Sequence, residues 1–98
     1  MIGVFVTFQL GEKFDPEAVR KMAEESKPKF TGMPGLRSKA FTLDTEKREA
    51  TNFYVWNSEE AAKAFFNEET IERVTRRYGV RPSVRFVQIS ALVENTAR

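Results

Sequence analysis

Apolar and polar residues alternate along four segments of the chain, which is the pattern of β-strands whose side chains point to opposite faces of a sheet. The four segments are residues 2–10, 36–43, 48–56 and 83–93. In the first segment the even-numbered residues from Ile2 to Leu10 are all apolar, and Phe5 lies on the other face. The alternation therefore predicts four strands, each with a face suited to a core.

The segment between the first two strands has helical spacing. Asp15 and Pro16 form a typical start, with the aspartate as N-cap and the proline in the first turn. Val19 and Met22 begin a stripe of small and apolar residues with charges between them. Because proline removes a backbone hydrogen bond, we expect Pro28 to end this helix or to kink its end.

A second helical segment follows the third strand. Ser58 is a suitable N-cap, and residues 67–70 are expected to break or bend the helix. Ile71 and Val74 then continue an apolar stripe that stops at Gly79, a residue that readily adopts the left-handed conformation of a helix end.

The predicted order of elements is β-α-β-β-α-β, which indicates a single α+β domain over residues 1–98. This is the ferredoxin-like arrangement, a four-stranded antiparallel sheet with both helices on one face. The other face would keep several apolar side chains, which are Phe5, Phe41, Leu43, Phe53, Val55, Val87 and Ile89. A second copy of the chain packed against that face would cover them, so we expect a homodimer. Alternatively, some of these side chains lie at strand ends or under loops.

The third strand carries the most informative polar pattern. Asn52, Tyr54 and Trp56 share one face, and their amide, phenol and indole suit the wall of a pocket that binds a small aromatic ligand. Burying the Asn52 amide without a partner would cost about 1–3 kcal/mol, so it should bond to a neighbour or a ligand. The alternatives are a core tryptophan and an exposed asparagine near the strand start.

Further candidates surround this face. Phe65 and Phe66 would form core and pocket wall, and Tyr78 would hang over the pocket mouth or belong to the core. Arg37 and Lys39 could stabilise an enolate or phenolate, and Gln9 is a polar position on the first strand. Such charged residues also commonly form the solvated edge of a strand.

Composition narrows the possible chemistry. The 98 residues include 16 basic and 14 acidic side chains, and the net charge of +2 does not indicate a nucleic-acid binder. A basic cluster could bind RNA, but no aromatic RNA-binding motif accompanies it; its members are Arg73, Arg76, Arg77, Arg81 and Arg85. The chain has no cysteine and no histidine, which excludes disulfides, thiolate nucleophiles and the commonest general base. No long apolar segment or signal-peptide pattern occurs, so we expect a cytoplasmic protein that does not enter a membrane.

Four short motifs resemble a known superfamily. They are Met33-Pro34-Gly35-Leu36, Asn52-x-Tyr54-x-Trp56, Ser58-Glu59-Glu60-Ala61-Ala62 and the stretch 72–82. Their order and spacing are similar to those of the dimeric α+β barrel superfamily, and within it to the mono-oxygenases of the YdhR type.

The resemblance implies two chains with packed sheets, and in each chain a pocket between sheet and helices. Relatives include mono-oxygenases of aromatic polyketides that need no cofactor, in which an asparagine and a tryptophan four residues apart line the pocket. Asn52 and Trp56 have that spacing. Many relatives also have a histidine near the position of Phe65, and its absence here argues against haem chemistry.

The first functional hypothesis is therefore a cofactor-independent mono-oxygenase of a small aromatic or quinol-type substrate. Asn52 and Tyr54 would hold oxygen atoms, and Trp56 would shape the cavity. No metal or cofactor is expected, and the proton acceptor is unassigned in a chain without histidine. The alternatives are a ligand-binding or stress-associated dimer without catalysis, and an isomerase or cyclase that uses the same pocket.

Overall fold

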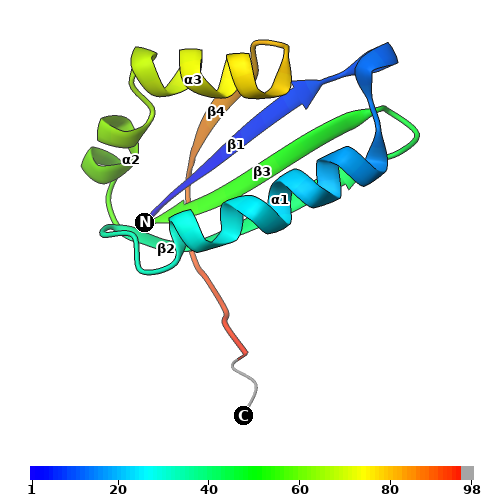
Figure 1. Ribbon diagram of the computed structural model, residues 1–98. Coiled ribbons are helices and arrows are strands. Elements are labelled where there is room, and N and C mark those ends of the chain that lie inside the picture. Colours follow the sequence, from blue (N-terminus) through cyan, green and yellow to red (C-terminus); the bar gives the residue numbers. More distant parts are fainter. Residues whose placement is uncertain (96–98) are drawn as a thin grey trace.

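A computed structural model describes residues 1–95 and shows one antiparallel sheet with the strand order β2-β3-β1-β4 (Figure 1). The strands are β1 (Ile2–Gln9), β2 (Leu36–Asp44), β3 (Glu49–Trp56) and β4 (Ser83–Gln88). The predicted domain also includes residues 96–98, which lie outside the described part. The two central strands, β1 and β3, carry the most buried side chains because each has a neighbour on both sides.

The helices cover one face of this sheet, as Figure 1 shows. They are α1 (Pro16–Phe30), α2 (Glu59–Phe65) and α3 (Glu68–Tyr78), with a short 3₁₀ turn η1 (Gly11–Lys13) before α1. The ferredoxin-like prediction is confirmed, with the second helix divided in two. Asn67 causes the division, because its side-chain oxygen accepts the backbone N–H of Thr70 at 2.8 Å and so starts α3 as a new N-cap.

The first helix continues through Pro28, so the prediction that it could end there is wrong. Asp15 caps its start by accepting the backbone N–H of Glu17 at 3.1 Å. At the other end, the N–H and the hydroxyl of Thr31 both donate to the carbonyl of Lys27, at 3.2 and 3.1 Å. These bonds satisfy a carbonyl of the last turn, which helps the helix to reach Phe30 beyond the proline.

The strand pairing corrects the predicted faces of β2. Phe41 lies opposite Asn52 and Leu43 opposite Ala50, and directly opposed residues of an antiparallel pair share a face. Phe41 and Leu43 therefore lie on the helix side, and the prediction that they belong to the other face is wrong. The register is irregular between Leu36 and Ser38, at the start of β2.

The face without helices consequently has a smaller apolar patch than expected. Phe5 and Phe53 lie side by side on it, with ring centroids 4.6 Å apart. Gly3 lies between Phe53 and Val87, where an added Cβ would come within 3.0 Å of both side chains. The glycine thus allows these two side chains to meet over the centre of the sheet.

The fourth strand ends at Gln88 instead of Val93, because its partner β1 begins at Ile2, directly opposite Gln88. One further bond joins the N–H of Ile89 to the carbonyl of Met1 at 3.2 Å. The following residues leave the sheet (Figure 1).

Candidate functional site

Three neighbouring hollows open on the helix side of the sheet. The first, of about 410 Å³, lies between α1 and β2 and includes Asn52 and Tyr78 in its lining. The second, of about 480 Å³, lies between α1 and α3 above Lys39. The third, of about 280 Å³, lies where α1 ends beside the start of β2. All three share Phe41 and together are called the inner cleft below.

Asn52 and Tyr78 form a polar pair at the first hollow. The amide Nδ2 of Asn52 lies 3.4 Å from the Tyr78 hydroxyl, to which it donates, and Asn52 is only 5% exposed. The alternative of an exposed asparagine is therefore wrong. The Tyr78 ring stacks on Phe8, with centroids 3.7 Å apart, so a core residue fixes the position of the phenol. The structure brings these two predicted site residues together.

Trp56 belongs instead to a packed aromatic cluster beneath α2. Its ring lies 5.3 Å from Phe65 and 6.1 Å from both Tyr54 and Phe66, measured between centroids. Trp56 is 2% exposed, and its indole N–H has no hydrogen-bond partner among residues 1–95. None of Trp56, Phe65 and Phe66 lines the inner cleft. The cluster supports the cleft from behind through Tyr54, which contacts both regions.

Lys39 occupies an aromatic cage at the boundary of the second and third hollows. Its Nζ lies 3.4 Å from the ring centroid of Phe30, 4.1 Å from that of Phe41 and 4.4 Å from that of Tyr54. Burial, with a smaller contribution from the charge of Lys29, lowers the pKa of Lys39 to about 7. The aromatic faces favour the ammonium while desolvation disfavours it, so both protonation states are accessible near neutral pH.

Tyr54 has the opposite tendency. Burial, and secondarily the neighbouring Tyr78, raise the pKa of the Tyr54 phenol well above its ordinary value. The hydroxyl therefore stays protonated at neutral pH and can act as a hydrogen-bond donor but not as a base.

Arg37 and Gln9 are placed differently from the other candidates. Arg37 lines the third hollow, but its guanidinium is engaged by Glu94, with Nη2 and Oε1 2.6 Å apart. Gln9 is exposed on the face without helices, where it donates to Glu49 at 3.3 Å. The structure does not bring Gln9 to the inner cleft.

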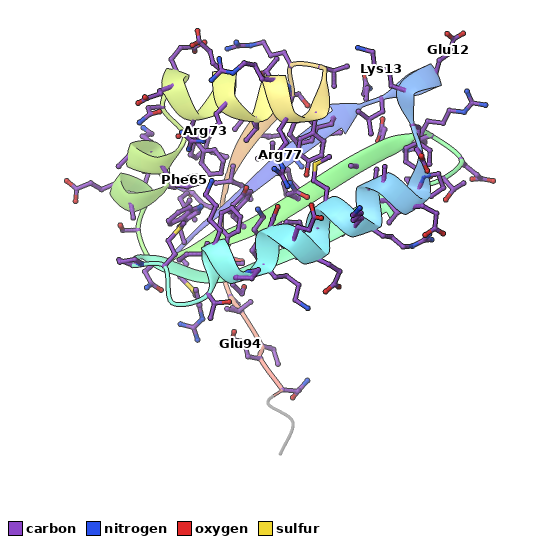
Figure 2. The ribbon with its side chains drawn as sticks, in the orientation of Figure 1. Glu12, Lys13, Phe65, Arg73, Arg77 and Glu94 are labelled. Atoms are coloured by element: carbon purple, nitrogen blue, oxygen red, sulfur yellow. The ribbon has the colours of Figure 1, made fainter. Side chains whose placement is uncertain are left out.

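Sequence reasoning grouped Arg73, Arg76 and Arg77 as a basic cluster but missed that they form one wall with Lys29 and Lys39 between α1 and α3. Five basic side chains line the second hollow with a single carboxylate, Glu25; they are Lys29, Lys39, Arg73, Arg76 and Arg77. None of the five forms an ion pair within the described chain. Figure 2 shows Arg73 and Arg77 reaching from α3 toward α1. Their spacing of four residues, which places both on one helix face, could have revealed this wall.

An antiparallel four-stranded sheet with helices and a cleft on one face defines a ferredoxin-like α+β protein. A monooxygenase from the gene ActVA-Orf6 of Streptomyces coelicolor, solved in complex with the ligand Nanaomycin D, has the same fold. Its TM-score is 0.67 at 18% identity, over 97% of this chain and 92% of that chain. A putative antibiotic biosynthesis monooxygenase from Deinococcus radiodurans is also similar. Its TM-score is 0.65 at 7% identity, over 99% of this chain and 100% of that chain.

Sequence comparison identifies the family. No curated protein matches the chain by sequence. The family described as "Putative mono-oxygenase ydhR" matches residues 4–95, and the chain belongs to this family. The family description supports a mono-oxygenase-like function, and the structural neighbours support the fold. Among residues 1–95, no helix combines the length and the apolar character that crossing a membrane requires.

Proposed function

We propose that this protein is a mono-oxygenase that oxidises a small phenolic or quinol-type molecule with dioxygen and uses no metal or organic cofactor. The observation that carries the proposal is the part-buried Asn52–Tyr78 pair at an aromatic cleft whose second hollow is lined by five cations that form no ion pair within residues 1–95. An apolar wall binds the ring, the polar pair orients its oxygen atom, and the positive charges stabilise the phenolate.

The reaction balances without a further reductant. A naphthol supplies all four electrons that dioxygen accepts. One oxygen atom bonds to a ring carbon and becomes the second carbonyl of a naphthoquinone. The other leaves as water with two substrate hydrogens, one from the hydroxyl and one from that ring carbon. The protein supplies orientation and a preorganised electrostatic environment for the anion.

In this proposal Asn52 and Tyr78 contact the substrate, and Lys39 lines the region that binds it. Tyr54 donates a hydrogen bond to the substrate beside the lysine cage. Trp56, Phe65 and Phe66 support that wall from the core.

Oxygen uptake with 1-naphthol and substituted hydroquinones tests the proposal. Wild-type protein should consume oxygen and release the quinone with one atom of ¹⁸O from labelled dioxygen. Asn52→Leu should lower kcat/KM by about 10²–10³-fold, because a positioned donor is worth roughly 2.7–4 kcal/mol in the transition state. Asn57→Leu is the matched control, since Asn57 is exposed and lines none of the three hollows. Binding without oxygen uptake would instead indicate a ligand-binding protein, and conversion without oxygen uptake would indicate an isomerase or cyclase.

The same proposal includes a homodimer formed through the face without helices. Phe5, Phe53 and Val87 supply its apolar centre, which a second sheet would cover. Light scattering after size exclusion should give twice the mass of one chain, and Phe53→Glu should give a single chain. A wild-type monomer at micromolar concentration would refute this part.

A further inference from the structure

We propose that Lys39 is the proton acceptor of the inner cleft, taking the hydroxyl proton of a bound phenol onto its neutral amine. This inference rests on the proposed function, because it presumes a phenolic substrate. It assigns the step for which a chain without histidine has no obvious residue.

The position of Lys39 is the first support. Its side chain extends from β2 on the helix side and reaches a cage formed by α1, β2 and β3. Lys39 lines both the second and the third hollow, so an aromatic ring that extends from one hollow into the other would lie beside it. A phenol that stacks in this aromatic region would bring its hydroxyl within reach of Nζ.

The absence of an acidic partner is the second support. Within residues 1–95, Lys39 forms no ion pair and no hydrogen bond with another side chain. A lysine whose ammonium is stabilised by a carboxylate would hold its proton, whereas a desolvated lysine near another cation releases it more easily. Buried lysines of this kind serve as general bases.

Positive groups predominate among the charged and titratable groups around Lys39. Facing it or lining the hollows it shares are Glu25, Lys27 and Lys29 from α1, Arg37 from β2, Tyr54 from β3, and Arg73, Arg76, Arg77 and Tyr78 from α3. Of these, Lys27 is paired with Glu24 and Arg37 with Glu94. Glu25 is the one carboxylate in the set. The charge of Lys29 disfavours a protonated Lys39, and the excess of positive charge in the set favours a phenolate beside it.

The chemistry of the step is balanced. The Nζ lone pair takes the hydroxyl proton, which gives an ammonium and a phenolate. The phenolate ring carbon bonds to dioxygen. The proton on that carbon passes to the departing oxygen as the O–O bond breaks, which gives the quinone and hydroxide. The hydroxide then receives the proton held by Lys39 and leaves as water, so the amine is regenerated.

Two substitutions separate a base from a fixed positive charge. Lys39→Met removes both the base and the positive charge and leaves an unbranched side chain of similar length. Lys39→Arg keeps the charge, but its guanidinium cannot lose a proton. If Lys39 is the acceptor, both variants should lose about 10²–10⁴-fold in kcat/KM at pH 7. The loss in Lys39→Met should shrink as pH rises, because the substrate then ionises in solution. An active Lys39→Arg variant would overturn the proposal.

The absorption spectrum of bound 1-naphthol gives a measurement that does not need turnover, because the anion absorbs at longer wavelength than the neutral molecule. Wild-type protein should bind the anion at pH 7.5, and Lys39→Met should bind the neutral form. Ionisation without oxygen uptake would reject the proposed function yet support Lys39 as acceptor. A neutral naphthol in wild type, or equal ionisation in both proteins, would overturn the inference.

A ¹³C titration of the Lys39 Cε resonance, assigned by its loss in Lys39→Met, needs no ligand. Titration near the ordinary lysine pKa of about 10.4 would also overturn the inference.

Discussion

Replacing Lys39 by methionine should make the protein more stable, and the gain should depend on pH. In the folded chain, burial lowers the Lys39 pKa from 10.5 to about 7. Below pH 7 the lysine is protonated in the folded and the unfolded chain, so the full desolvation penalty is present. Between pH 7 and about 10.5 the unfolded chain binds more protons than the folded chain, and stability therefore rises with pH. Above this range the amine is neutral in both states and the penalty is gone.

The size of the effect follows from the shift. Each unit of pKa corresponds to about 1.4 kcal/mol, so the penalty at pH 6.5 is on the order of 5 kcal/mol. Because one proton is involved, the advantage of Lys39→Met should fall by up to about 1.4 kcal/mol per pH unit between pH 7.5 and 9.5. Methionine should also pack well against the three rings of the cage.

Urea unfolding followed by circular dichroism at pH 6.5, 7.5, 8.5 and 9.5 measures the free energy of unfolding of the variant and of wild type. The titrations of all other groups largely cancel in the difference between the two. Lys47→Met is the matched control, because Lys47 is exposed in the turn between β2 and β3 and loses little water on folding. The pH dependence of Lys39→Met is read relative to this exposed control. A constant difference for Lys39→Met over the whole range would refute the argument that the Lys39 ammonium is desolvated.

Three further predictions concern the framework of the site. Phe8→Ala should destabilise the fold by about 3–5 kcal/mol in urea unfolding, since Phe8 is fully buried, and should weaken ligand binding by releasing Tyr78. Trp56→Phe should change KM and kcat less than about twofold; a tenfold rise in KM would place the indole in the binding site, contrary to its packing against Phe65. Asn67→Ala should cost about 1 kcal/mol through loss of the α3 cap, and no change in the urea midpoint would contradict that role.

Local signals in the sequence were sufficient for most of the elements. Asp15, Ser58 and Gly79 act within a few residues of their own positions, and the structure shows the two caps and a left-handed φ of 85° at Gly79. The alternation along β1 and β3 likewise predicted which side chains face the helices. Such features depend on backbone hydrogen bonds and side-chain direction over one or two turns, so the sequence alone determines them.

Features that depend on distant partners were decided by the tertiary structure. The face of Phe41 depends on its pairing with β3, and the end of β4 depends on where β1 begins. The alternation along β3 puts Trp56 and Asn52 on the same face of the sheet. In the structure, α2 covers Trp56, whereas the inner cleft reaches Asn52. The Lys39 cage combines rings from α1, β2 and β3, which only the packing of the helix on the sheet brings together. The sequence by itself thus determined the elements and the polar face of β3. Desolvation of Lys39, the property on which the proposed chemistry of the cleft rests, arises only from long-range packing.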